Sequence, residues 1–118
     1  MGTFHVTIEV GDPEGRQYEA VEALVDTGAT YTVVPASLLR RLGVTPHTKA
    51  PFELADGRRR EMELGRGWVR IGEKAEQTLV VFGDEEAGAL LGAYTMEGLL
   101  LAADPVHQRL VDVPGLLM

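Results

Sequence analysis

Asp26 is the residue whose surroundings point most directly to chemistry. It follows the apolar residues Leu24 and Val25 and opens the run Asp-Thr-Gly-Ala, after which a second apolar segment begins. An ionised carboxylate beside buried residues is costly unless it is hydrogen-bonded or protonated. Gly28 lets a backbone N–H approach the carboxylate with no Cβ in the way, and the Thr27 hydroxyl can fix the loop. The triplet therefore supplies an acid, a hydroxyl that can fix the loop and an accessible backbone N–H in three consecutive residues.

A solvent-exposed turn is the alternative interpretation of this triplet. Asp-x-Gly is common in turns, because Asp caps its own backbone and Gly accepts a positive φ. Here two apolar runs flank the triplet, and a short helix is expected soon after it. An exposed turn needs neither feature, so the context favours a functional site.

Residues 23–35, ALVDTGATYTVVP, closely resemble the active-site loop of retropepsin-like aspartic proteases. The motif of that family is two apolar residues, then Asp-Thr/Ser-Gly, then Ala or Ser. A second motif, two apolar residues and a glycine before a short helix, is matched by Leu90, Leu91 and Gly92. The resemblance covers nearly the whole chain. It implies a single domain over residues 1–118 with a mainly β, closed-barrel-like retropepsin (acid protease) fold, one or two short helices, and a homodimer.

The same resemblance implies roles for individual residues. Asp26 would be the catalytic aspartate, Thr27 would hydrogen-bond across a two-fold axis, and Gly28 would present its backbone to the carboxylate and the substrate. Further residues at the substrate would lie after the motif, on a hairpin that covers the cleft as a flap, and on the second motif. These are Ala29, Thr30, Tyr31, Val33, Ala55, Asp56, Gly57, Arg58 and Leu91.

One acid is too few for this chemistry. Peptide hydrolysis by this route needs an activated water and a proton donor to the carbonyl at the same time. Two carboxylates that share one proton do both, because like charges about 3 Å apart cannot both be ionised. None of the other aspartates follows two apolar residues and precedes Thr/Ser-Gly; they are Asp12, Asp56, Asp84, Asp104 and Asp112.

The sequence therefore predicts a homodimer with Asp26 of each chain on the two-fold axis. The predicted function is an aspartic endopeptidase that acts on peptide or protein substrates. The alternative is a non-catalytic dimerisation or peptide-binding module that retains the fold, because a fold alone does not establish turnover.

The apolar C-terminal segments allow two interpretations. They could pair across subunits in an interface sheet, or they could fill the core of the monomer. The segments are residues 99–101, 110–113 and 116–118.

Two features differ from the family pattern. Retropepsin flaps usually have a glycine-rich tip, whereas this one has Gly57 followed by three arginines. Two interpretations are possible. The arginines could form a solvated charged turn, or they could lie over the cleft and favour acidic substrates. Viral members commonly carry an arginine directly after the second-motif glycine, where this chain has Ala93, so their interface salt bridge is not assumed here.

Composition excludes several other classes. The net charge of −7 argues against nucleic-acid and anionic-membrane partners, because phosphate contacts need a basic surface. Without cysteine the chain has no disulfide, thiol nucleophile or cysteine metal site. The histidines His5, His47 and His107 match no local metal-binding spacing, so no metal or cofactor is expected. No signal peptide or membrane span is visible, and a cytoplasmic protein is expected.

The elements that must position Asp26 follow from the pattern of apolar residues. Residues 3–10 predict a strand with one buried face, and residues 17–25 predict its hairpin partner. The apolar residues of that face are Phe4, Val6, Ile8 and Val10. Residues 30–34 are rich in β-branched side chains and predict a third, short strand.

The rest of the chain predicts short elements. Pro35 can begin a helix that ends at Gly43, with the leucines at 38, 39 and 42 facing inward. A loop with two prolines is expected next, over residues 44–51. After the flap hairpin come two strands around a polar turn, a loop, an apolar segment with a short helical turn, and a last strand. Their expected ranges are 67–72, 78–83, 84–88, 89–105 and 107–113.

The flap segment FELADGRRREMEL is a strong hairpin signal centred on its Asp-Gly pair. A two-residue turn would set Phe52 opposite Glu61. A three-residue loop over residues 56–58 would set Phe52 opposite Met62. The second register keeps apolar residues on one face and is the one predicted here, although it also sets two glutamates opposite each other.

Overall fold

The first two strands form the predicted hairpin. In the computed structural model, which describes residues 3–117, β1 (Phe4–Gly11) pairs antiparallel with β2 (Tyr18–Val25). Successive side chains of a strand point to opposite faces. Phe4, Ile8 and Val10 are accordingly buried, and Val6 packs against the same core.

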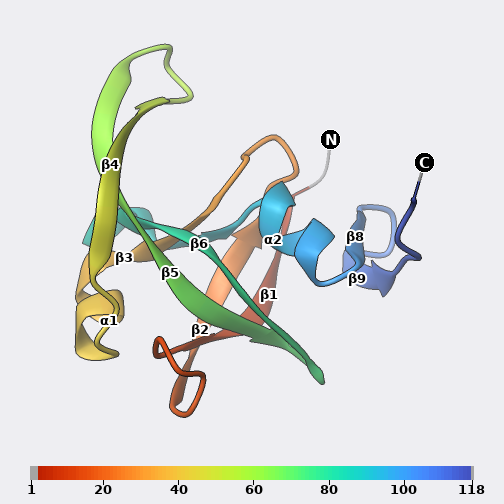
Figure 1. The fold of residues 1–118 in the computed structure, drawn as a ribbon. Helices are drawn as coiled ribbons and strands as arrows, with labels where there is room; N and C mark the ends of the chain where they lie inside the picture. The colour runs from red at the N-terminus through yellow and green to blue at the C-terminus, as the bar shows by residue number, and fades with distance from the viewer. Residues whose placement is uncertain (1–2, 118) are drawn as a thin grey trace.

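Six strands close into a barrel (Figure 1). Their order is β1-β2-β7-β3-β6-β5, and β5 pairs back to β1. The remaining members are β3 (Thr32–Pro35), β5 (Arg59–Ile71), β6 (Lys74–Gly83) and β7 (Ala89–Leu91). With the short helices α1 (Ala36–Arg41) and α2 (Ala93–Gly98), this architecture confirms the prediction of a mainly β, closed-barrel-like fold.

The short strand β7 sets the geometry of the site. It runs parallel to β2, with Val25 beside Leu91, and antiparallel to β3, with Val33 beside Leu90. The C-terminal ends of β2 and β7 are therefore neighbours, although about 65 residues separate them in the sequence. This pairing brings Asp26 and Gly92, the residues that follow the two strands, to the same edge.

The core fills the barrel with branched aliphatic side chains. The largest fully buried apolar residues are Ile8, Val10, Val34, Leu39, Val44, Val69, Val80 and Leu91. Each such side chain contributes roughly 1.5–3 kcal/mol when it leaves water. α1 buries Leu38 and Leu39 as predicted, and Gly43 ends the helix segment with φ +83°.

Residues 44–51 were predicted as a loop, and this prediction is wrong. β4 (Pro46–Glu53) is a strand that pairs with β5. It lies at the open edge of the sheet and has a neighbouring strand on one side only. Pro46 and Pro51, which lack a backbone N–H, are tolerated in such an edge strand. The polar turn expected over residues 73–77 is also shorter, because the strands β5 and β6 are joined by Gly72 and Glu73 alone.

The predicted flap register is wrong by one position in the loop. The observed loop has three residues, but they are residues 55–57, so Phe52 lies opposite Arg60. The Gly57 N–H donates to the Leu54 carbonyl at 2.9 Å, and Gly57 adopts φ +87°. Three-residue hairpins place a left-handed residue last in the loop, and glycine accepts that conformation without strain.

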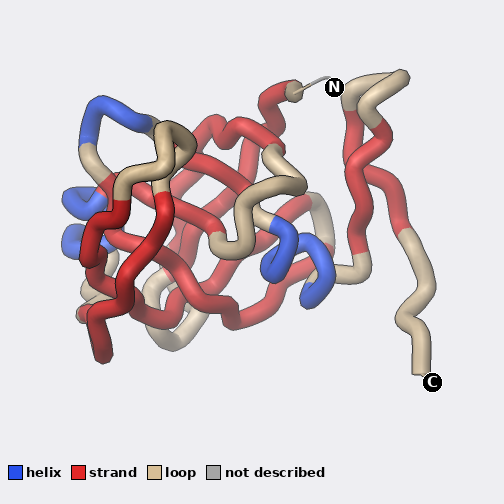
Figure 2. Tube along the Cα trace, turned by 90° about the horizontal axis from the view of Figure 1, so that it is seen from above, coloured by secondary structure: helices blue, strands red, loops and turns tan. Residues whose placement is uncertain are grey.

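The C-terminal hairpin stands apart from the barrel. β8 (Leu101–Asp104) and β9 (Arg109–Asp112) form a separate two-stranded sheet beside α2 (Figure 2). Leu99 and Leu101 are buried in the monomer core, whereas Leu116 and Leu117 are 81% and 101% exposed. The core interpretation therefore holds for Leu99 and Leu101, whereas the interface interpretation of the exposed end stays a prediction. Residue 118 lies outside the described residues.

No helix among residues 3–117 is both long enough and apolar enough to cross a membrane.

Candidate active site

Asp26 is the first residue after β2 and is half-buried. Its N–H donates to the Leu91 carbonyl at 3.1 Å, and its own carbonyl accepts the Ala29 N–H at 3.2 Å. The Gly28 N–H donates to Oδ1 at 2.9 Å. The backbone and the side chain of Asp26 are thus both held by hydrogen bonds.

The start of α2 clamps the loop that carries Asp26. The Ala93 N–H donates to the Ala29 carbonyl, and the Tyr94 N–H donates to the Thr30 carbonyl, both at 2.9 Å. A Cβ on Gly92 would lie 2.5 Å from the Tyr31 carbonyl carbon, so only glycine lets the two backbones approach so closely. The second sequence motif therefore serves as the backbone support of the first.

A chain of buried hydroxyls lies beneath this clamp. The Gly92 N–H donates to Thr32 Oγ1 at 3.1 Å, and Thr32 Oγ1 donates to Thr95 Oγ1 at 2.7 Å. Thr95 Oγ1 also shares a 3.1 Å hydrogen bond with Thr78 Oγ1. All three threonines are buried. The sequence analysis missed them. The signal of Thr32 and Thr78 was weak because a threonine beside valine or leucine also suits a strand, and Thr95 lies on the short helix α2 with no local feature that marks it.

Three aromatic rings join the loop to the flap and to α2. Tyr31 makes edge-to-face contacts with Phe52 at 6.0 Å and with Tyr94 at 5.7 Å between ring centroids. Such pairs add about 0.5–1.5 kcal/mol beyond the area that they bury. Phe52 and Tyr94 were not predicted as site residues, because their contact with Tyr31 depends on the tertiary fold.

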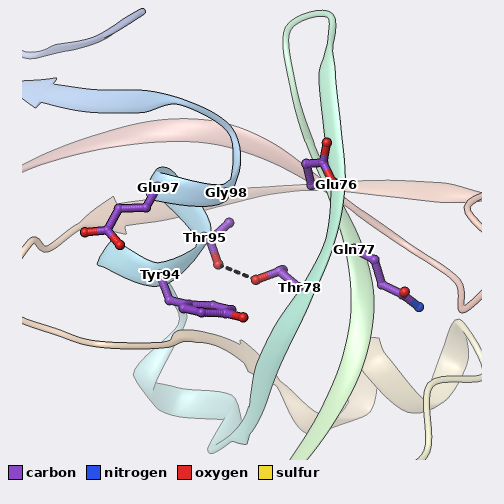
Figure 3. A pocket seen from close by; sticks show the side chains of 7 residues that line it. All are labelled: Glu76, Gln77, Thr78, Tyr94, Thr95, Glu97 and Gly98. Carbon is purple, nitrogen blue, oxygen red and sulfur yellow. Dashed lines mark hydrogen bonds between the residues drawn. The ribbon is translucent and has the colours of Figure 1, made fainter. Parts of the chain in front are cut away.

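Four of the predicted residues line a common hollow of about 190 Å³. It is bounded by Thr27, Gly28, Ala29 and Thr30 from the loop, and by Ala93, Tyr94 and Glu97 from α2. A larger hollow of about 280 Å³ shares Tyr94 and Glu97 with it and extends to β6 (Figure 3). The smaller one touches Thr27 and Gly28 of the Asp-Thr-Gly loop, but Asp26 itself is not among the residues that line it.

The other predicted site residues are dispersed. Leu91 is fully buried, so its side chain belongs to the core and only its carbonyl reaches the site. Val33 is half-buried beside Leu90. The flap residues Ala55, Asp56, Gly57 and Arg58 lie at the tip of the β4–β5 hairpin, at the same end of the barrel as the Asp26 loop (Figures 1 and 2).

The arginines of the flap are largely engaged within the chain. Arg58 Nε lies 2.7 Å from Asp56 Oδ2. Arg60 makes a two-pronged contact with Asp84, at 2.7 and 2.9 Å. The Arg60 guanidinium lowers the pKa of Asp84, and the Asp84 carboxylate in turn raises the pKa of Arg60. These pairs favour the interpretation of a solvated charged turn over a free cationic surface for acidic substrates.

Metal chemistry finds no support among residues 3–117. No group of three or more His, Cys, Asp or Glu side chains in this range is arranged to hold an ion.

A family model and solved structures match this chain. The model of the family described as "gag-polyprotein putative aspartyl protease" matches residues 15–97. A retropepsin-like aspartic protease from Rickettsia conorii, known from its crystal structure, is similar in fold with a TM-score of 0.54. The two are 17% identical, and the match covers 86% of this chain and 87% of that one. No curated protein sequence matches the chain.

Proposed function

Because the chain belongs to the gag-polyprotein aspartyl protease family and has a retropepsin-like fold, we propose that it is a homodimeric aspartic endopeptidase. Each subunit contributes Asp26 to one active site on the two-fold axis, and the substrate is a peptide or an unfolded protein segment.

The observation that carries this proposal is the setting of Asp26. Its backbone is anchored to Leu91, and one carboxylate oxygen is held by the Gly28 N–H. Asp56 and Asp104 likewise accept the backbone N–H two residues on. The other five aspartates differ from Asp26 in their further partners. They contact the backbone of Arg16 and Gln17 or the side chains of Arg58, Arg60, His107 and Lys74. One chain therefore holds one acid suited to the chemistry, and a second copy is the simplest source of the other.

In the proposed reaction the two Asp26 carboxyl groups share one proton. The ionised carboxylate takes a proton from the bound water as its oxygen attacks the scissile carbonyl carbon, and the protonated one gives its proton to the carbonyl oxygen. The tetrahedral intermediate then collapses: the carboxyl group that took the water proton gives it to the amide nitrogen, the other carboxylate takes a proton from a hydroxyl group of the intermediate, and the C–N bond breaks. We expect activity to be best at acidic pH, because the reaction needs one of the two carboxyl groups to be protonated.

Asp26→Asn tests the chemistry. We expect the wild-type protein to cleave members of a broad peptide library and to be blocked by a statine-type inhibitor. The variant should lose at least about 10³-fold in kcat, since an amide can neither take nor give the proton. Its melting temperature should change little. Wild-type activity in Asp26→Asn would overturn the proposal, and peptide binding without cleavage by the wild type would favour the non-catalytic module.

A mixing experiment tests the shared site. Wild-type and Asp26→Asn chains are unfolded together in equal amounts and refolded, so that subunits combine at random. If each site needs Asp26 from both chains, about a quarter of the wild-type activity remains per total protein. Independent sites, one per chain, would instead leave about half.

A further inference from the structure

We propose that the buried hydroxyl chain formed by Thr78, Thr95 and Thr32 is a positioning network for Asp26. This inference rests on the function proposed above. The chain ends on the peptide group between Leu91 and Gly92, whose N–H donates to Thr32 Oγ1. The carbonyl of the same peptide group accepts the Asp26 N–H. One rigid peptide plane thus connects the hydroxyl chain to the backbone of the acid.

The burial of these side chains indicates that their hydroxyl groups do more than fill space in the core. Thr32, Thr95 and Thr78 are 0%, 2% and 4% exposed, and Thr78 and Thr95 line the base of the larger hollow shown in Figure 3. A buried hydroxyl is costly unless it is hydrogen-bonded, and valine would fill the same space without that cost. A network that is fully connected gives rigidity and a unique arrangement in return.

The three threonines come from three elements that must keep a fixed relation at the site. Thr32 lies on β3, Thr95 on α2 and Thr78 on β6. Figure 3 shows the hydroxyls of Thr78 and Thr95 facing each other where α2 meets β6. α2 carries the N–H groups that hold the Asp26 loop, so a hydroxyl chain that fixes α2 against β3 and β6 also fixes that loop.

The position of the chain determines what it controls. Between Asp26 and Tyr31, the loop receives backbone hydrogen bonds at Ala29 and Thr30 from the first turn of α2. A small rotation of α2 would move these donors and tilt the Leu91–Gly92 peptide group. Catalysis is sensitive to such displacements, because misplacing a reacting group by about 1 Å can cost 10²-fold in rate.

The test replaces the central hydroxyl. Thr95→Val keeps the side-chain shape and removes the oxygen that both Thr32 and Thr78 contact. We expect kcat to fall about 10- to 100-fold with KM changed less than about twofold, since the acid would be misaligned while the cleft stays intact. Thr95→Ser, which keeps the hydroxyl, should restore kcat.

A core variant separates positioning from lost stability. Val44→Ala removes buried volume beside α1, far from α2 in Figure 1. If Val44→Ala lowers the melting temperature as much as Thr95→Val does, it should still keep the wild-type kcat. Equal losses of kcat in Thr95→Val and Val44→Ala, or no recovery in Thr95→Ser, would overturn the proposal. Thr78→Val, at the outer end of the chain, replaces Thr95→Val if that variant does not fold, and its kcat should fall in the same direction.

Hydrogen exchange gives a readout that needs no activity. In Thr95→Val the amide protons of Asp26 and Gly92 should exchange at least about tenfold faster, because local opening would cost less. In Thr95→Ser they should exchange as in the wild type. Unchanged protection of both amides in Thr95→Val overturns the positioning network. A wild-type protein without peptidase activity contradicts the proposed function alone, and the exchange data still decide this inference.

Discussion

The Asp26 carboxylate is oriented by the Gly28 N–H, which lies 2.9 Å from Oδ1. A hydrogen bond to a charged acceptor is stronger than one between neutral groups, and it selects one side-chain rotamer. A Cβ built on Gly28 lies 3.3 Å from the same oxygen. The glycine therefore supplies the donor and also the space that the carboxylate occupies.

Gly28→Ala should damage activity more than stability. The added methyl group would push Oδ1 by a few tenths of an ångström, which misaligns the acid while the surrounding fold can relax. We expect kcat to fall about tenfold or more and the free energy of unfolding to change by less than about 1 kcal/mol. Steady-state kinetics and thermal unfolding of the same samples measure both quantities.

Gly98→Ala is the matched control, because a Cβ there meets nothing within 4 Å. It should keep wild-type kcat. If Gly28→Ala and Gly98→Ala have the same kcat, the close packing of Gly28 against the carboxylate has no catalytic importance.

At this scale the sequence identifies residues whose role follows from local chemistry. Asp26, Thr27 and Gly28 were predicted as site residues because an acid, a hydroxyl and a glycine in a row lie between two apolar runs, and their catalytic role stays a prediction. Thr95 and Tyr94 could not be predicted, because their partners Thr78 and Tyr31 are distant in sequence. Neither the spacing nor the composition of the sequence indicates which buried threonines form hydrogen bonds with one another.

Among the elements, the flap hairpin shows that the local pattern of apolar residues does not determine the strand register. Apolar alternation favoured a register with Phe52 opposite Met62, whereas the structure pairs Phe52 with Arg60. The loop conformation determines the register, because Gly57 has the left-handed conformation required at the last loop position. The strand β4 was missed for a related reason: its prolines are tolerated only because it lies at a sheet edge, which topology alone reveals.

The flap is also tied to the barrel by the ion pair between Arg60 on β5 and Asp84 after β6. Arg60 lowers the pKa of Asp84 below its usual 3.8. The contribution of the pair is therefore complete above that usual value and is lost as the pH falls through the lowered pKa of the folded state. The flap should be held in place at mildly acidic pH and released in stronger acid.

Asp84→Asn should release the flap at every pH. We expect amide protons at the flap tip to exchange faster in the variant than in the wild type at mildly acidic pH, with little change in global stability, since the pair is exposed. The two proteins should converge once the pH falls below the lowered pKa of Asp84. Asp112→Asn, which removes an exposed pair with Lys74 on β6, is the control and should leave flap exchange unchanged. Equal flap exchange in the wild type and Asp84→Asn at mildly acidic pH would falsify this view of the flap.

For the molecule as a whole, the barrel and its two helices could be predicted because the strand pattern, the Asp-Thr-Gly loop and the second motif agree with one another. The division of the apolar tail could not. Leu99 and Leu101 face the core, whereas Leu100 is 45% exposed in the same short run. That division depends on how β8 turns away from α2 to form a separate hairpin with β9, and apolar character alone does not encode the direction.

The exposed end of the tail gives the last prediction. Leu116 and Leu117 are 81% and 101% exposed in the monomer, and a dimer that covers them would gain roughly 1.5–3 kcal/mol for each side chain fully buried. The double variant Leu116→Ser/Leu117→Ser should therefore weaken dimerisation at least about tenfold, as measured by sedimentation velocity. Its specific activity should fall with dilution at concentrations where the wild type is still fully active, because half a site cannot act.

Val106→Ser is the control for this prediction. Val106 is 82% exposed in the turn between β8 and β9, so the substitution removes a comparable apolar surface away from the tail. We expect its dissociation constant and its activity to match those of the wild type. If the tail variant dimerises as strongly as the wild type, the tail does not form the interface. If both variants dissociate alike, the whole hairpin forms it. A tail variant that dissociates but keeps full activity as a monomer would contradict the shared Asp26 site itself, since one carboxyl group cannot both activate the water and protonate the carbonyl.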